Sequence, residues 1–445
     1  MNPTRFRSAW EIGRTVPGPR PLPPLRPRRP AEPPATADVV LDNGLRVLAA
    51  RLATAPTVEL RLYVPFAGPD PTHLAGADLL ATALFSGTAR RDRDRMETEL
   101  GSIGGTLAAE ADQIRLLVAG HGPASGLPLL LDHVADVLTG ATYPEPTFTR
   151  DRDRCAQQRQ AEGSQPQLRA RAARRRHCYG DHPLGWPIPQ PAHVLAIDVE
   201  WVRQLHRRAV VPRGSILVVV GDLHPDAAVE AAAGTLADWR SERVAAELAP
   251  APAIGGAEPA LVHQAGAVLS QIRLCAPAVS YPDRRYPALQ LANQILGGYF
   301  SSRLVANLRE RQGFTYSVRS AFEHTPGGAA ILIDTDTANE VVEPALAEIG
   351  TELAGLGTRP PSAAEVAAAR QYTIGNQQLA AATQAGLASS LLTLAAAGLD
   401  AGWPAAHAAR LEGVTVDDVG AAAMEFLAPG RCAGVVIGDA TAWRN

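Results

Sequence analysis

The sequence contains no lysine, so each of its 42 basic residues is an arginine. This absence excludes a lysine Schiff base, a phosphate-binding P-loop lysine and a lysine general base. Every permanent positive charge on a side chain is a planar guanidinium group, which suits carboxylates and carbonyl oxygens. Because the codons for Arg, Ala, Gly and Pro are GC-rich, the missing lysine first indicates a GC-rich genome and says little about function.

Cysteines, net charge and long apolar runs are also scarce. Net charge of -3 indicates no global attraction to nucleic acid or to an anionic membrane. No apolar run approaches the roughly 20 residues that span a bilayer, and the N-terminus lacks the apolar segment of a secretory signal. We therefore expect a cytoplasmic protein with no nucleic-acid or membrane partner. Neither a disulfide framework nor a zinc knuckle is indicated, because no CxxC spacing occurs among the four cysteines, Cys155, Cys178, Cys275 and Cys432.

Residues 1–38 are dominated by Pro and Arg, as in PGPRPLPPLRPRRPAEPP. Prolines at this density support neither a helix nor an inner strand, so an extended arm is predicted. Two interpretations stay open for this arm. It is either a disordered tail or a segment that lies along a partner subunit, with Phe6 and Trp10 as apolar anchors.

Folded sequence begins at Val39, where two short apolar runs around Asn43-Gly44 predict a β-hairpin. From 244 to 261 the chain is rich in Ala, Pro and Gly, which is typical of a linker. The order of predicted elements after the linker repeats the order before it, at an offset near 210 residues, which indicates an internal duplication. The prediction is an α+β fold with two related domains, 39–243 and 262–445, each a mainly antiparallel sheet backed by helices.

The periodicity of apolar residues places the individual elements. Helices are predicted near 79–84 and over 94–103, 126–139, 151–176, 227–239, 287–296, 301–311, 339–355 and 380–398. Strands are predicted over 58–64, 105–120, 215–222, 269–277, 314–323 and 328–335. The segment 380–398 is apolar but contains Thr, Gln and Ser, so we expect a buried helix and not a membrane span.

The most specific local pattern is NLRERQGFTYSV at 307–318, preceded by LGGYFSSRL at 296–304. The first half carries GADLLATALFSGT at 76–88, the opening Asn43-Gly44-Leu45 and GDHPLG at 180–185. With these segments the chain resembles the insulinase-like (pitrilysin, M16) metallopeptidases, in the bacterial half-length subgroup akin to mitochondrial processing peptidase. The resemblance implies that the two domains form half of a clamshell around a chamber for short or unfolded peptides.

Active members of that family carry His-x-x-Glu-His on a helix of the first domain, with a further Glu ligand about 75 residues later. The resemblance places these four positions at Asp78, Ala81, Thr82 and Gln158. One carboxylate and one hydroxyl cannot complete a three-ligand zinc site, and Ala81 cannot activate water. We therefore expect no metal in this chain and no peptide hydrolysis by this chain alone.

The corresponding motif of the second domain is intact. Family members use an Arg and a Tyr seven residues later to bind substrate carbonyls, and Arg309 and Tyr316 have this spacing. A guanidinium fork and a phenol O–H are suitable donors for a developing oxyanion. On the residues alone, a charge at a helix end and a half-buried tyrosine are the competing interpretation.

These matches predict a noncatalytic, substrate-binding subunit of a heterodimeric zinc endopeptidase. A homologous partner subunit would hold the zinc, as a heterodimer or a dimer of heterodimers, and peptide would be the substrate. The alternative is a catalytically inactive structural or peptide-binding protein that acts without a peptidase partner. A different hydrolytic chemistry has no support, because no Cys–His or Ser–His pairing follows from the sequence.

Three further segments have more than one interpretation. His177-Cys178-x-x-x-His182 has loose metal-ligand spacing, but His182 is expected to pack at a turn before Pro183. The arginines of 169–176 are interpreted as a solvated helix face, with attraction of acidic substrate as the alternative. The alternating charges of 90–95 are predicted to form a surface loop.

Overall fold

The computed structural model describes residues 33–443. The predicted N-terminal arm lies outside the described residues as far as residue 32, and so do its proposed anchors Phe6 and Trp10. The first strand begins at Thr36, three residues before the predicted start at Val39. We call residues 33–243 the first half and residues 262–443 the second half.

The first half contains a six-stranded sheet in the order β1-β2-β6-β3-β5-β4. Its strands are β1 Thr36–Val40, β2 Arg46–Arg51, β3 Thr57–Pro65, β4 Thr106–Ala111, β5 Arg115–Pro123 and β6 Ile216–Gly221. The predicted hairpin is confirmed, because β1 pairs antiparallel with β2 across the Asn43-Gly44 turn. Gly44 adopts a positive φ of 87°, which a residue with a Cβ rarely adopts.

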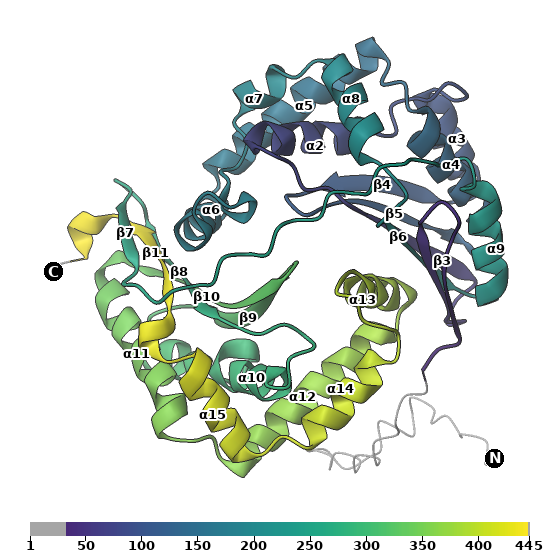
Figure 1. Ribbon diagram of the computed structural model, residues 1–445. Helices are drawn as coiled ribbons and strands as arrows, with labels where there is room; N and C mark the ends of the chain where they lie inside the picture. Colours follow the sequence, from purple (N-terminus) through teal and green to yellow (C-terminus); the bar gives the residue numbers. More distant parts are fainter. Residues whose placement is uncertain (1–32, 444–445) are drawn as a thin grey trace, which may run out of the picture. The chain divides into compact units, whose positions relative to one another are not determined.

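Helices cover one face of this sheet, and their apolar side chains form the first core (Figure 1). They are α2 Pro71–Ala83, α3 Arg93–Ser102, α4 Leu127–Gly140, α5 Glu145–Ser164, α7 Pro191–Leu195, α8 Val199–Ala209 and α9 Pro225–Thr235. One further helix of this half, α6 Pro166–Tyr179, does not belong to this layer. The predicted single helix over 151–176 is wrong in one respect, since Pro166 divides it into α5 and α6. A proline inside a helix removes a backbone hydrogen bond and clashes with the preceding turn.

The second half contains a five-stranded sheet in the order β7-β11-β8-β10-β9. Its strands are β7 Ala260–His263, β8 Leu269–Pro277, β9 Val318–Thr325, β10 Gly328–Ala338 and β11 Ala433–Gly438. Its helices are α10 Tyr286–Asn293, α11 Val342–Thr358, α12 Ala363–Ala381, α13 Gln384–Ala396, α14 Trp403–Glu412 and α15 Val416–Phe426. Two π-helical segments, Gln294–Gly298 and Val305–Arg311, stand where the sequence predicted regular helix.

The two sheets share one topology, which accords with the predicted duplication. In each, a parallel pair (β2 with β6, β7 with β11) continues through antiparallel pairs to an edge strand, β4 or β9. Corresponding strands begin 212 to 217 residues apart in the chain. The predicted α+β fold with two sheets backed by helices is confirmed. Between the halves, residues 244–259 contain no helix and no strand beyond one bridge from Ala246 to Phe66.

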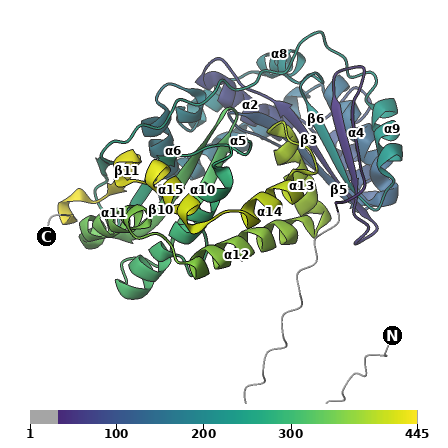
Figure 2. The same ribbon diagram turned by 60° about the horizontal axis from the view of Figure 1, so that its bottom comes forward.

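Each half also lends one helix to the other half's sheet. Helix α13 packs on β3 and β6 of the first sheet, and α6 packs on β8 and β11 of the second (Figure 1 and Figure 2). This exchange explains why β6 and β11 are buried along their entire length. In β6, Val219 faces the core of its own half and Val218 faces α13, so both faces must be apolar.

None of the described helices is by itself long and apolar enough to cross a membrane. Only α12 and α13 together reach that length and composition, and the pair is bent by 111°. The buried helix predicted over 380–398 is confirmed in α13, whose leucines pack on the first sheet.

Candidate functional site

In the first half, the degenerate motif lies on α2, which begins at a well-formed cap. Asp70 accepts hydrogen bonds from the backbone N–H groups of Thr72 and His73, which stabilises the first turn. The helix then packs against α5 and α8. Gly76 permits this packing, because a Cβ there would stand 1.8 Å from the Trp201 ring. The motif positions are therefore held in a rigid, mostly buried helix.

Asp78 forms an ion pair with an arginine that the sequence did not single out. Arg159 Nε lies 3.3 Å from Asp78 Oδ2, and Arg159 Nη1 lies 2.5 Å from Glu162 Oε2. The side chains of Asp78, Arg159 and Glu162 are 8%, 19% and 21% exposed. Burial raises the pKa of Asp78 to about 7, and the Arg159 charge opposes this shift.

The predicted ligand position Gln158 is exposed and donates to Glu162 Oε1 at 2.9 Å. The structure does not bring Gln158 to Asp78; it brings its neighbour Arg159 there. Cys155, Arg159 and Glu162 recur at i, i+4 and i+7, which places them on one helical face. This spacing was visible in the sequence and is the signal that identifies the inward face of α5.

The other two motif positions line a hollow of about 370 Å³. Ala81 presents only a methyl group, and Thr82 donates its hydroxyl to the backbone oxygen of Asp78 at 2.8 Å. The rest of the lining is mixed, with Phe85, Arg93, Met96, Glu97, Leu100, Leu107, Ala108, Ala109 and Arg154. Within residues 33–443, no three His, Cys, Asp or Glu side chains are grouped so that they could hold a metal ion.

In the second half, Arg309 lies in the π-helical segment Val305–Arg311. Such wide turns are often found at functional sites. Asn307 fixes the segment to α11 by donating to Glu348 and Glu352, each at 2.8 Å. Among the described residues, the only carboxylate that an ion pair joins to Arg309 is its neighbour Glu310, at 3.4 Å.

Tyr316 lies on the short loop before β9. Thr315 anchors this loop by donating to the backbone oxygen of Asp336 at 2.7 Å and by accepting from Thr335 at 2.9 Å. Gly313 provides the preceding turn with a φ of 66°. The anchored loop leaves Tyr316 85% exposed.

The structure brings Arg309 and Tyr316 together, as the motif spacing led us to expect. The Arg309 guanidinium carbon lies 5.1 Å from the Tyr316 ring centroid and 5.0 Å from that of Phe300. Phe300 is 68% exposed. The two rings hold the guanidinium by cation–π contact while its N–H edges remain available to a ligand. Sequence reasoning missed Phe300, although it lies in the quoted segment 296–304.

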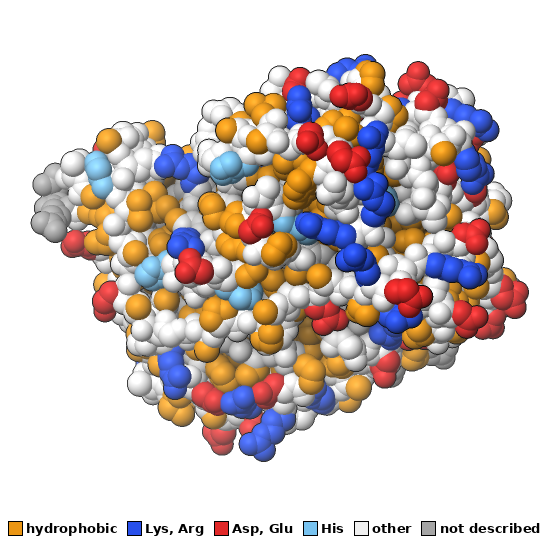
Figure 3. Space-filling view, turned by 45° about the horizontal axis from the view of Figure 1, so that its top comes forward, with side chains coloured by type: hydrophobic (Ala, Val, Ile, Leu, Met, Phe, Trp, Pro, Cys, Tyr) orange, Lys and Arg blue, Asp and Glu red, His pale blue; other side chains and the backbone are white. Residues whose placement is uncertain are grey.

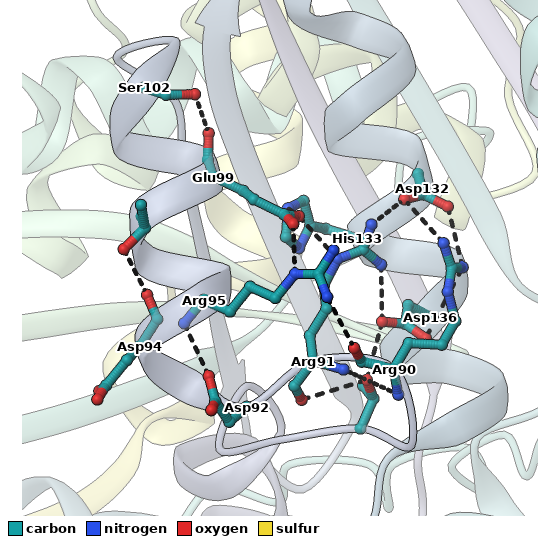
Figure 4. Close-up of polar contacts among 12 residues, drawn as sticks. Arg90, Arg91, Asp92, Asp94, Arg95, Glu99, Ser102, Asp132, His133 and Asp136 are labelled. Carbon is teal, nitrogen blue, oxygen red and sulfur yellow. Dashed lines mark hydrogen bonds and ion pairs between the residues drawn. The ribbon is translucent and has the colours of Figure 1, made fainter.

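The charged segment 90–95 is only partly the predicted surface loop, because most of it is exposed but α3 begins at Arg93 and Arg91 turns inward. Arg91 is 7% exposed and donates to Glu99, Asp132 and Asp136 (Figure 4). The Arg95 and Arg91 hydrogen bonds lower the pKa of Glu99 to about 2. The segment instead ties α3 to α4, because its carboxylate partners come from both helices. An alternation of charges in the sequence does not reveal which of the charged side chains is buried.

The arginines of 169–176 are only partly the predicted solvated face. Arg169, Arg171 and Arg176 are exposed, in keeping with that interpretation. Arg174 is 3% exposed and reaches Asp334 on the second sheet at 3.0 Å, while Arg175 reaches Glu323 at 3.0 Å. These pairs join α6 to the other half. On the face drawn in Figure 3, arginine and acidic side chains are intermixed.

The same helix carries a disulfide that the cysteine spacing did not indicate. Cys178 of α6 is bonded to Cys275 of β8, with the two Cα atoms 7.6 Å apart. Metal binding by His177-Cys178-x-x-x-His182 finds no support, since Cys178 is bonded elsewhere. His182 packs at the turn before Pro183, as expected, and its Nδ1 accepts from the Leu184 N–H at 3.3 Å.

Comparison with known proteins gives a consistent result across the chain. Residues 46–192 match the family described as insulinase (peptidase family M16), and residues 196–372 match the peptidase M16 inactive domain. A peptidase M16 inactive domain from Pseudomonas fluorescens has a TM-score of 0.82 at 20% identity. A protease from Helicobacter pylori has a TM-score of 0.84 at 18% identity. Each comparison covers 92% of this chain and 100% of the other.

Relatives in sequence carry related descriptions. An uncharacterized zinc protease of Mycobacterium tuberculosis is 24% identical over 307 residues, 66% of this chain and 69% of that protein. Another from Streptomyces coelicolor is 24% identical over 291 residues, 63% of each chain. Both halves of the molecule therefore have counterparts in one family, and the chain belongs to the M16, or insulinase, family of metallopeptidases.

Proposed function

We propose that this chain is the noncatalytic, substrate-binding subunit of a two-chain zinc endopeptidase. The observation that carries the proposal is the contact of the half-buried Arg309 with the exposed Tyr316, because the guanidinium has no carboxylate partner beyond Glu310 among the described residues. Cation–π contacts at exposed rings contribute only about 0.5–1 kcal/mol to the stability of a fold. The pair is better explained by a ligand.

The ligand would be the backbone of an extended peptide. Arg309 donates through its fork to a carbonyl oxygen, and Tyr316 donates its phenol O–H to the oxyanion that develops there. When bound by a homologous partner chain with an intact His-x-x-Glu-His, zinc would supply the polarisation of the attacking water. This chain contributes orientation of the peptide and stabilisation of negative charge.

The experiment is reconstitution with a homologous chain from the same organism that carries an intact His-x-x-Glu-His motif. The mixture should form a complex that cleaves unstructured peptides, and a zinc chelator should abolish cleavage. Neither chain alone should do so. Cleavage by this chain alone, or equal activity of the partner with and without it, would contradict the proposal.

The alternative, an inactive structural or peptide-binding protein without a peptidase partner, predicts a different result. Under it, this chain binds unstructured peptides in isolation, and no homologous zinc-bearing chain changes its behaviour. Fluorescence anisotropy with a labelled peptide separates the two outcomes, because binding without any partner-dependent cleavage supports only the alternative.

A further inference from the structure

The first half departs from its family by more than the loss of ligands. The fit of zinc can be tested on the donor set of α2 and α5. Position 78 offers one carboxylate, position 81 a methyl group, and position 82 a hydroxyl already bonded to a backbone oxygen. A catalytic zinc site requires three protein ligands, so these residues do not fit the ion.

A cation is nevertheless present beside Asp78. Arg159 contacts Asp78 through Nε and Glu162 through Nη1, so two carboxylates flank one guanidinium. Asp78 Oδ2 and Arg159 Nε have no hydrogen-bond partner among the described residues, which leaves their mutual ion pair as the compensation for burial. Removing Arg159 would leave the buried carboxylate of Asp78 without compensation, whereas removing Asp78 would leave Arg159 paired with Glu162.

We infer that the guanidinium of Arg159 replaces the zinc ion of the family as the internal cation of the first half and excludes a metal from it. The reason is electrostatic: a divalent ion beside Asp78 would stand next to a permanent positive charge in a partly dry site. The inference also corrects the alignment, because residue 159 and not residue 158 is the position of α5 that faces the motif.

The inference is tested on this chain alone, so its outcome is independent of the proposed function. Two variants share Asp78→His, Ala81→Glu and Thr82→His, which restore the family motif. One adds Arg159→Glu, and its matched control adds Gln158→Glu while keeping Arg159. Zinc per chain is measured by mass spectrometry after dialysis, and affinity by calorimetric titration with zinc chloride.

We expect about one zinc per chain with Arg159→Glu, and binding at least about 100-fold weaker in the control, because the charge at position 159, beside the divalent ion, differs by two units. Equal zinc in both variants would overturn the inference, and so would preferential binding by the Gln158→Glu variant. Zinc in neither variant would show that Arg159 is not what closes the site, and would overturn it too.

A second measurement does not depend on a fourfold substitution. At pH 8, Arg159→Met should lower Tm by several degrees, because the buried Asp78 would lose the cation that lies 3.3 Å from it. The double variant Asp78→Asn with Arg159→Met should recover most of that loss. Arg150→Met is the matched control, since Arg150 is exposed on the same helix and, within residues 33–443, its side chain bonds only the Pro146 oxygen. Additive effects of the two substitutions would contradict an internal ion pair.

Discussion

Apart from the additional edge strand β1 of the first sheet, the two halves have the same strand order, yet they use arginine in opposite ways. In the first half Arg159 lies between two carboxylates and is 19% exposed. In the second half Arg309 lies between two aromatic rings, with only a neighbouring glutamate as its ionic partner among the described residues. The partners of an arginine therefore distinguish one that stabilises the fold from one that is presented to a ligand.

The same contrast should hold for the other arginines of the chain. Those paired with buried carboxylates should affect stability and leave binding alone. Those that face solvent beside aromatic rings should affect binding and leave stability alone. Substitutions that separate these two effects test the contrast between the halves.

The largest effect on stability is expected at Arg91. Arg91→Met should lower the free energy of unfolding by about 3–5 kcal/mol, because the buried Asp136 would lose its cation. The neighbouring Arg90 is 59% exposed and pairs with the same carboxylates, so Arg90→Met should cost under about 1 kcal/mol. Urea unfolding followed by circular dichroism measures both, and equal losses would refute the distinction by burial.

The largest effect on activity is expected at Arg309. In the reconstituted complex, Arg309→Ala should reduce kcat/KM by at least about 100-fold, as removal of an oxyanion donor does. The free energy of unfolding of the Arg309→Ala chain, measured without the partner, should change by about 0.5 kcal/mol or less, as for substitutions at the surface. Arg311 is two residues away and 68% exposed, so Arg311→Ala is the control and should retain activity. A large loss of stability in Arg309→Ala would place this residue with Arg159.

A smaller effect concerns two histidines that no ion pair joins to a carboxylate among the described residues, the half-buried His324 and the buried His407. His324 and His407 lie in an aromatic cluster of the second half, with Tyr281, Tyr286, Phe322 and Trp403. Burial lowers the pKa of each histidine to about 4, and the Arg410 charge adds to the shift at His407. Neither Nδ1 has a hydrogen-bond partner among the described residues.

The sign of the pH effect follows from these pKa values. Between pH 6.5 and 4 the unfolded chain binds protons that the folded histidines do not, so stability falls as pH falls in this window. Between pH 7 and pH 5, each of the two histidines should lower the free energy of unfolding by about 2 kcal/mol. His324→Phe should remove the share of this loss that belongs to His324, about 2 kcal/mol, while it preserves the stacking. Thermal unfolding at pH 5 and pH 7 measures this, and an unchanged loss in the variant would assign the effect elsewhere.

Much of the fold could be predicted because periodicity reports burial directly. The hairpin at Asn43-Gly44, the strand Leu269–Pro277 and the duplicated order all follow from local pattern. What could not be predicted is contact between the halves. The apolar runs of β6 and β11 required a cover on both faces, but the sequence did not name α13 and α6 as the covers. The ion pair of Arg174 with Asp334 belongs to the same interface.

The candidate site likewise contains residues that the sequence could identify and a contact that it could not. Arg309 and Tyr316 were found because they lie seven residues apart in one continuous motif, and the structure brings them into contact. The contact of Asp78 with Arg159 depends on how α5 is rotated against α2, which a count along the sequence fixes only to within a residue. One residue on a helix is a turn of about 100°, which is enough to exchange an exposed Gln158 for an inward Arg159.

The smallest effect, at Tyr316, tests whether the exposed pair acts as one unit. Tyr316→Phe keeps the ring that stacks on Arg309 and removes only the O–H, so stability should not change at an 85% exposed position. If the O–H donates to the oxyanion, kcat/KM in the complex should fall by about 10-fold or less, as expected for one neutral hydrogen bond.

An unchanged kcat/KM in Tyr316→Phe would show that only the ring of Tyr316 is used, to hold the guanidinium of Arg309. A loss as large as that of Arg309→Ala would show that neither donor works without the other, because residues that act as a unit give strongly non-additive losses. The double variant separates these cases, since independent donors would multiply their fold-losses and coupled donors would not.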